Sequence, residues 1–163
     1  MILHAITALT AAELTPRLAA QTRPVVEDWK DPSCGYCKDW GTHLQANRFN
    51  VKVSDAGHTE ARARLGIAFA LGSCHTAQAG GYAIKGHATA TGIRQLLNEK
   101  PKTVGLAVPG MPTGSPGMDS SLYGTHKNAH QVMPVLQGGS TRVLNAYPST
   151  SPTPSTASKK EIS

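Results

Sequence analysis

The most informative segment of this chain is Asp31-Pro32-Ser33-Cys34-Gly35-Tyr36-Cys37-Lys38-Asp39-Trp40. It holds two of the three cysteines of the chain at the spacing Cys-x-x-Cys, which places two sulfurs within reach of one disulfide bond or one soft metal ion. The third cysteine, Cys74, stands apart. If Cys74 folds back onto the pair, the chemistry shifts from plain redox exchange towards thiolate metal binding.

The residues around the cysteine pair predict alternating strands and helices. A helix is predicted over residues 34–46, since Cys37, Trp40 and Leu44 recur on one face. Strands are also predicted at 25–29, 49–53 and 104–108, with a hairpin turning at Gly80-Gly81 and a final hairpin within 132–147. Two further helices are predicted: a short one capped by Ser54 or Asp55 that ends at Leu65, and one capped by Thr89 or Thr91 that ends before Pro101. Residues 109–118 are predicted to form a shaped loop. Pro134 predicts that the first strand of this last hairpin lies at a sheet edge.

This order of elements is that of a thioredoxin-like domain. The predicted fold class is therefore α/β and thioredoxin-like, with Cys-x-x-Cys at a helix N-terminus, where the backbone N–H groups favour a thiolate, and with an added C-terminal hairpin. In such a domain the segment that enters the first hairpin passes close to the cysteine pair, and Cys74 lies in that segment. A thioredoxin normally has a cis-proline there. This chain has no proline between Pro32 and Pro101, which weakens the oxidoreductase interpretation.

The cysteines leave several chemical hypotheses open. Cys34 and Cys37 could exchange disulfides, with Cys34 as the attacking thiolate and Cys37 as the resolving thiol, or could form a structural disulfide. With Cys74 they could bind Cu(I), which prefers thiolates in low coordination. His75 could complete a Cys₃His zinc site that stabilises the fold. Since adjacent strand residues point to opposite faces, His75 is expected to be a weaker ligand than Cys74.

The remaining histidines are interpreted as structural or exposed. His87 follows the first hairpin and is interpreted as a capping or loop residue. His43, His58, His126 and His130 have no ligand-like spacing and are expected to face solvent. No serine–histidine–aspartate set, carboxylate pair or phosphate-binding glycine loop is evident, so hydrolase and nucleotide-binding functions have no support.

Composition limits the partners. The 163 residues carry a net charge of +6, but the basic residues, among them Lys30 and Lys85, are dispersed, and aromatic residues make up only 5%. A mildly basic surface without nucleic-acid binding is expected. No apolar run reaches about 18 residues, so no membrane-spanning helix is expected. One domain is predicted over residues 23–147, after an arm or signal remnant at 1–22 and before a disordered Ser/Thr/Pro-rich tail at 148–163.

Several blocks of this sequence resemble a bacterial family, the CopG-type copper-resistance proteins, which are unrelated to the DNA-binding repressors of the same label. The similarity covers roughly residues 23 to 147. The blocks that carry it are Asp31–Trp40, Arg64-Leu65-Gly66-Ile67, Ser73-Cys74-His75-Thr76-Ala77, Gly81-Tyr82, Gly86-His87, and Val104-Gly105-Leu106-Ala107-Val108-Pro109-Gly110-Met111-Pro112 through Gly117-Met118.

The resemblance implies a thioredoxin-like fold, a periplasmic location and Cu(I) handling beside copper-efflux or copper-chaperone proteins. It also implies copper roles for the thioethers of Met111 and Met118, which suit Cu(I). Members of the family generally carry Cys-Gly-Cys-Cys, and their cysteines bridge copper ions. Tyr36 replaces the middle cysteine here, which favours a mononuclear or dinuclear site on three sulfurs over a larger cluster.

The resemblance places metal binding ahead of redox exchange. We therefore predict a protein of copper resistance or homeostasis that binds Cu(I) through Cys34, Cys37 and Cys74, with Met111, Met118 and His75 as weaker candidates. A metal-binding protein is favoured over an enzyme. The alternatives are a thiol–disulfide oxidoreductase that uses Cys34 and Cys37, and a module stabilised by zinc.

Overall fold

The computed structural model describes residues 22–150. The predicted arm at 1–22 lies almost entirely outside the described residues, as does most of the tail predicted at 148–163. Among the described residues, no helix is both long enough and apolar enough to cross a membrane.

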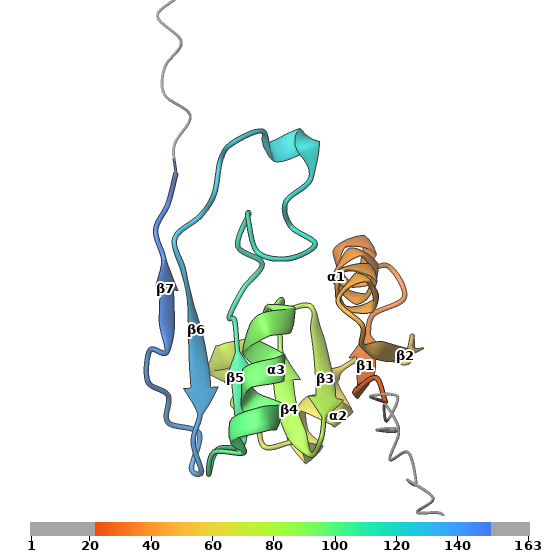
Figure 1. The fold of residues 1–163 in the computed structure, drawn as a ribbon, viewed down its shortest axis with the longest axis vertical. Coiled ribbons are helices and arrows are strands. Elements are labelled where there is room, and N and C mark those ends of the chain that lie inside the picture. The colour runs from red at the N-terminus through yellow and green to blue at the C-terminus, as the bar shows by residue number, and fades with distance from the viewer. Residues whose placement is uncertain (1–21, 151–163) are drawn as a thin grey trace, which may run out of the picture.

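The described chain is a mixed α/β fold built on one seven-stranded sheet (Figure 1). Its strands lie side by side in the order β2-β1-β3-β4-β5-β6-β7. Neighbouring strands pair in parallel at β1–β2 and β4–β5 and antiparallel elsewhere. The elements are β1 (Val25–Lys30), α1 (Gly35–Ala46), β2 (Asn50–Ser54), α2 (Thr59–Arg64), the short 3₁₀ turn η1 (Phe69–Leu71), β3 (His75–Ala79), β4 (Tyr82–Lys85), α3 (Ala90–Glu99), β5 (Gly105–Ala107), the 3₁₀ turn η2 (Ser121–Tyr123), β6 (His130–Val135) and β7 (Asn145–Tyr147).

Helix α1 begins at the cysteine pair, as predicted. Cys34 is the N-cap residue, and its sulfur accepts the backbone N–H of Cys37 at 3.3 Å. The predicted apolar face of this helix is buried, because Cys37, Trp40 and Leu44 are each at most 1% exposed. Cys34 therefore lies at the N-terminal end of α1, and Cys37 is buried in its first turn.

Two apolar clusters cover the two faces of the sheet. Side chains of α1 and α3 pack in one cluster with Ile84 and Leu106, so both helices cover the same face. The neighbouring strand residues Ala83 and Ala107 point to the other face, where they pack with the η1 segment that follows α2. This alternation is the two-residue period of a strand buried on both sides.

Most predicted turns and caps are present, with two corrections. Gly80 and Gly81 form the β3–β4 turn with positive φ angles, and the Thr89 side chain caps α3 by accepting the Gly92 N–H. The capping prediction for the short helix was wrong, because α2 begins only at Thr59, beyond both proposed caps.

The second correction concerns Pro134. The strand that contains it, β6, is not at the edge but lies between β5 and β7. Its pairing with β7 covers residues 130–132, whereas Pro134 pairs only with Leu106 of β5. The proline is thus tolerated because no β7 residue lies opposite it, so its missing N–H breaks no ladder on that side.

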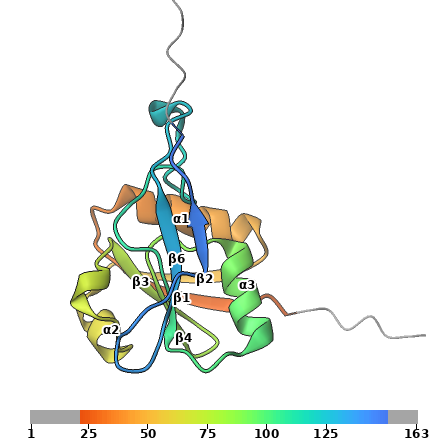
Figure 2. The ribbon, with the colours of Figure 1, turned by 90° about the vertical axis from the view of Figure 1, so that its left-hand side faces the viewer.

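The segment between β5 and β6 reaches back to the start of α1. It contains the predicted Pro/Gly loop 109–118 and then projects beyond the sheet with η2 at its tip (Figure 1 and Figure 2). At Gly117, with φ +78°, a Cβ would lie 2.6 Å from the backbone nitrogen of Trp40. Only glycine lets this loop approach the helix so closely.

Candidate metal centre

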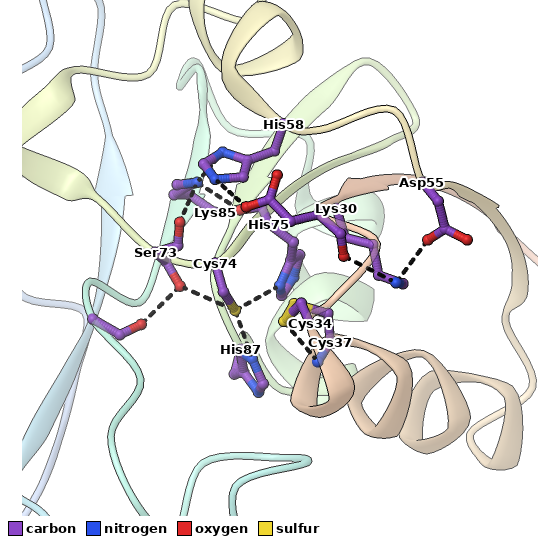
Figure 3. The surroundings of a disulfide bond; sticks show 12 residues. Lys30, Cys34, Cys37, Asp55, His58, Ser73, Cys74, His75, Lys85 and His87 are labelled. Carbon is purple, nitrogen blue, oxygen red and sulfur yellow. Dashed lines mark hydrogen bonds and ion pairs between the residues drawn. A yellow bond between two sulfur atoms is a disulfide. The ribbon is translucent and has the colours of Figure 1, made fainter.

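The cysteine pair is oxidised in this structure. Cys34 and Cys37 form a disulfide at the N-terminus of α1 (Figure 3). Cys34 is half-buried, whereas Cys37 is 1% exposed. The accessible sulfur of the pair is therefore that of Cys34, and Cys37 faces the interior.

Cys74 does fold back onto the pair. One ligand atom from each of Cys37, Cys74, His75 and His87 lies within 4.8 Å of each of the others. Figure 3 shows these four side chains converging from three directions: the first turn of α1, the start of β3 and the turn after β4. Once the Cys34–Cys37 disulfide is reduced, two soft sulfur donors and two imidazoles share one small region, a donor set that suits Cu(I) or Zn²⁺.

The adjacent residues Cys74 and His75 both reach this region. The Cys74 sulfur lies 3.5 Å from His75 Nδ1. The alternation rule that made His75 a weaker candidate does not apply, because β3 begins at His75 and Cys74 precedes it. The His75 ring is fully buried and lies 4.3 Å from the ring of Trp40, centroid to centroid.

His87 is the member of the cluster that the sequence interpretation assigned to a structural role. Gly86, with φ +72°, turns the chain immediately after β4 and brings His87 under Cys74. The His87 Nε2 lies 3.3 Å from the Cys74 sulfur, and its Nδ1 lies 2.6 Å from the carbonyl oxygen of Pro116. A carbonyl can only accept, so Nδ1 carries the proton and Nε2 presents its lone pair to the sulfur. The Gly86-His87 pair inside the resembling blocks was the one feature of the sequence that pointed to this residue.

Burial keeps the cluster electrically neutral. Burial raises the pKa of the Cys74 thiol, and the hydrogen bond from Ser73 and the nearby Lys85 ammonium only partly offset this rise. Burial also lowers the pKa of His75 and His87, and proximity to His87 lowers that of His75 further. At neutral pH both imidazoles are therefore unprotonated and able to coordinate a metal or accept a proton.

A buried lysine holds the Cys74 segment from the opposite side of β3. Lys85 is fully buried, and its amine donates to the carbonyl oxygens of Ser73 at 3.0 Å and His75 at 2.7 Å, one on each side of Cys74. It also donates to Thr76 Oγ1 at 3.1 Å. Burial lowers the Lys85 pKa to about 8. The expectation that Lys30 and Lys85 belong to a dispersed basic surface was wrong, because both are buried.

His58 links this lysine to the cysteine loop. The His58 Nδ1 lies 3.2 Å from the Lys85 amine, and the His58 Nε2 lies 3.8 Å from the carboxylate of Asp31. The backbone carbonyl of Asp31 in turn accepts the N–H of Cys34. The His58 side chain is only 18% exposed, so the expectation that His58 faces solvent was wrong. His126 is exposed as expected, whereas His43 and His130 are partly buried.

The two predicted methionines lie in different surroundings. Met118 is 5% exposed and follows Pro116, whose carbonyl fixes the His87 ring. Met111 is 37% exposed and lines an open cavity together with Cys34 and Tyr36.

Tyr36, the residue between the paired cysteines, points away from the cluster towards the projecting segment. Its hydroxyl lies 2.7 Å from that of Tyr123 in η2, which donates to it. The two rings are 6.4 Å apart, centroid to centroid. Tyr36 therefore attaches the projecting segment to the start of α1.

Comparisons with known proteins show which family the chain is similar to. A family model described as "Protein of unknown function, DUF411" matches residues 71–118, which contain Cys74, His75 and His87. No curated protein matches the chain. A solved structure entitled "Copper resistance protein copG- Form 1" is 41% identical, with a TM-score of 0.70, over 76% of this chain and 97% of its own. A second, "Copper resistance protein copG- Form 2", is 40% identical, with a TM-score of 0.71, over 77% of this chain and 99% of its own. With this identity over nearly the whole length of both structures, the chain belongs to the family of CopG-type copper-resistance proteins.

Proposed function

We propose that this protein binds Cu(I) in its reduced form and thereby sequesters or relays copper during copper resistance. The observation that carries the proposal is the convergence of Cys37, Cys74, His75 and His87, whose ligand atoms lie within 4.8 Å of one another. Thiolates and imidazoles are donors that Cu(I) accepts. Both similar solved structures are named copper resistance proteins.

The proposed ligands are Cys37 and Cys74, with Cys34 as the third sulfur once the disulfide is reduced. His87 is the better placed imidazole, because its tautomer leaves the Nε2 lone pair directed at Cys74. His75 is a further ligand candidate, while Met118 and the more exposed Met111 remain weaker ones. Because Tyr36 removes one thiolate, we propose one or two copper ions rather than a larger cluster.

We further propose a thioredoxin-like domain at residues 23–147 that acts in the periplasm. The order β2-β1-β3-β4, with α1 after β1 and α3 after β4, supports the first part of this proposal. Copper-efflux or copper-chaperone proteins are the proposed partners. Although the net charge is +6, the basic residues are not clustered with aromatic residues in the sequence, which argues against nucleic acid as a partner.

The test is an anaerobic Cu(I) titration of the reduced protein against a chromophoric chelator. Removing a thiolate from a site of three sulfurs should weaken binding strongly, so Cys74→Ser and Cys37→Ser are expected to lose at least tenfold in affinity. His126→Gln, which changes an exposed histidine outside the cluster, is the matched control and should bind as the wild type does. Equal affinity for the wild type and Cys74→Ser would refute the proposed site.

The oxidised pair supports a second candidate function, thiol–disulfide exchange. Cys34 caps α1 and is half-buried, while Cys37 is buried behind it, which is the arrangement of an attacking and a resolving thiol. An oxidoreductase of this kind needs only these two residues, so Cys74→Ser should retain reduction of a disulfide-linked peptide. A structural zinc site, the third possibility, predicts instead that a chelator unfolds the reduced protein.

A further inference from the structure

The three cysteines are arranged so that one free thiol lies against an existing disulfide. With Cys34 and Cys37 bonded, Cys74 is the free cysteine of the described chain. Its sulfur lies within 4.8 Å of the Cys37 sulfur, so the free thiol faces the disulfide at close range. The sulfur approached is that of Cys37, the buried member of the pair.

We propose that Cys74 is an internal nucleophile that exchanges with the Cys34–Cys37 disulfide, which forms a Cys37–Cys74 disulfide and releases Cys34 as a free thiol. The S–H proton of Cys74 passes to His87 Nε2, the Cys74 sulfur attacks the Cys37 sulfur, and the Cys34 sulfur leaves as a thiolate. The new S–S bond replaces the old one, so there is no net oxidation and no external oxidant or reductant is needed. The proton finally resides on Cys34, and His87 returns to its neutral form.

Two further features of the structure favour this exchange. The Pro116 carbonyl fixes the His87 tautomer with its unprotonated nitrogen 3.3 Å from the Cys74 sulfur, in position to accept the thiol proton. On the other side, Cys34 is the N-cap of α1, where the helix dipole and free N–H groups stabilise the departing thiolate. The nucleophile and the leaving group are thus each provided with a partner.

The consequence is a change in which thiol is presented. In one isomer the free thiol is Cys74, inside the cluster with the two imidazoles. In the other it is Cys34, half-buried in the cavity that it shares with Met111 and Tyr36. A protein with three cysteines can in this way transfer its free thiol from the interior to an accessible position without changing its oxidation state.

The test uses oxidised, copper-free protein and N-ethylmaleimide under native conditions, followed by acid quenching and peptide mapping without reduction. We expect label on Cys34 together with a Cys37–Cys74 linkage, in a fraction that grows with time at a rate independent of protein concentration. Label on Cys74 alone, with the Cys34–Cys37 linkage intact, would overturn the proposal. A labelling rate of Cys34 that rises with protein concentration would also overturn it, because the exchange would then be intermolecular.

A variant isolates the role of His87. His87→Gln should slow the labelling of Cys34 by roughly a hundredfold, the lower range of general base catalysis. The matched control is His43→Gln, which changes a partly buried histidine of α1 whose Nε2 has no hydrogen-bond partner and which lies outside the cluster. Equal rates in both variants would remove His87 from the step. The wild-type mapping needs neither variant to fold, and since no copper is present its result is independent of the proposed copper site.

Discussion

Replacing Asp28 by asparagine should change how the stability of this protein depends on pH. Asp28 lies in the middle of β1, is 1% exposed, and neither carboxylate oxygen has a hydrogen-bond partner. Burial raises its pKa from 3.8 to about 7, although the Lys30 ammonium opposes the rise. The folded protein therefore holds this proton over a pH range in which the unfolded chain has released it.

The size of the effect follows from that difference in pKa. A rise of about 3 in pKa corresponds to roughly 4 kcal/mol, because each factor of ten in proton affinity is worth about 1.4 kcal/mol. Between pH 3.8 and 7 the folded state binds more protons than the unfolded state. The free energy of unfolding therefore falls as the pH rises through that window, and above pH 7 the whole of this stabilisation has been lost. Asparagine carries no such proton, so Asp28→Asn should lack this contribution.

The assay is urea unfolding of the copper-free protein at pH 4, 6 and 8, with wild type and variant side by side. Titration of the histidines is common to both and cancels in the difference. We expect Asp28→Asn to gain roughly 4 kcal/mol relative to wild type between pH 4 and pH 8. Glu27→Gln, an exposed carboxylate of the same strand, should gain less than about 0.5 kcal/mol. Parallel pH profiles for the wild type and Asp28→Asn would show that Asp28 does not hold its proton in the folded state.

Three further substitutions test the packing around the site. Gly117→Ala would place a Cβ 2.6 Å from the backbone nitrogen of Trp40 at a φ of +78°, so the urea midpoint should fall by the equivalent of roughly 2 kcal/mol; an unchanged midpoint would contradict the close approach. Trp40→Phe removes the indole N–H that donates to the Ala88 carbonyl at 2.9 Å, so the free energy of unfolding should fall by about 1–3 kcal/mol in the same assay. A fall below about 0.5 kcal/mol would argue against that hydrogen bond. Lys85→Met removes the amine that donates to both carbonyls flanking Cys74. Amide hydrogen exchange should therefore accelerate more in the segment around that cysteine than in α3. Equal acceleration in both segments would instead indicate global destabilisation.

The local features of the fold were predictable because short sequence patterns determine them. The spacing of Cys37, Trp40 and Leu44 predicted α1, and the Gly80-Gly81 pair predicted the β3–β4 turn. Both patterns act within a few residues. The register of β6 against β7 depends on the whole sheet, which is why the position of Pro134 could not be inferred from its own strand.

The site was predictable only in part. The cysteine spacing and the order of elements suggested that Cys74 returns to the pair, and the structure places it there. The contribution of His87 depends on the Gly86 turn and on the Pro116 carbonyl, which is 29 residues away in sequence. The role of Lys85 could not be inferred either, because a lysine in a strand gives no indication that backbone carbonyls of Ser73 and His75 will surround its amine.

The most direct test of the copper site is X-ray absorption at the copper edge of the reduced, Cu(I)-loaded protein. We expect a first shell dominated by sulfur, together with the outer-shell scattering of imidazole. The imidazole scattering should diminish in His87→Gln, and the number of sulfur neighbours should fall in Cys74→Ser. A first shell of oxygen and nitrogen alone, or a spectrum that neither substitution changes, would contradict binding at the cluster of Cys37, Cys74, His75 and His87.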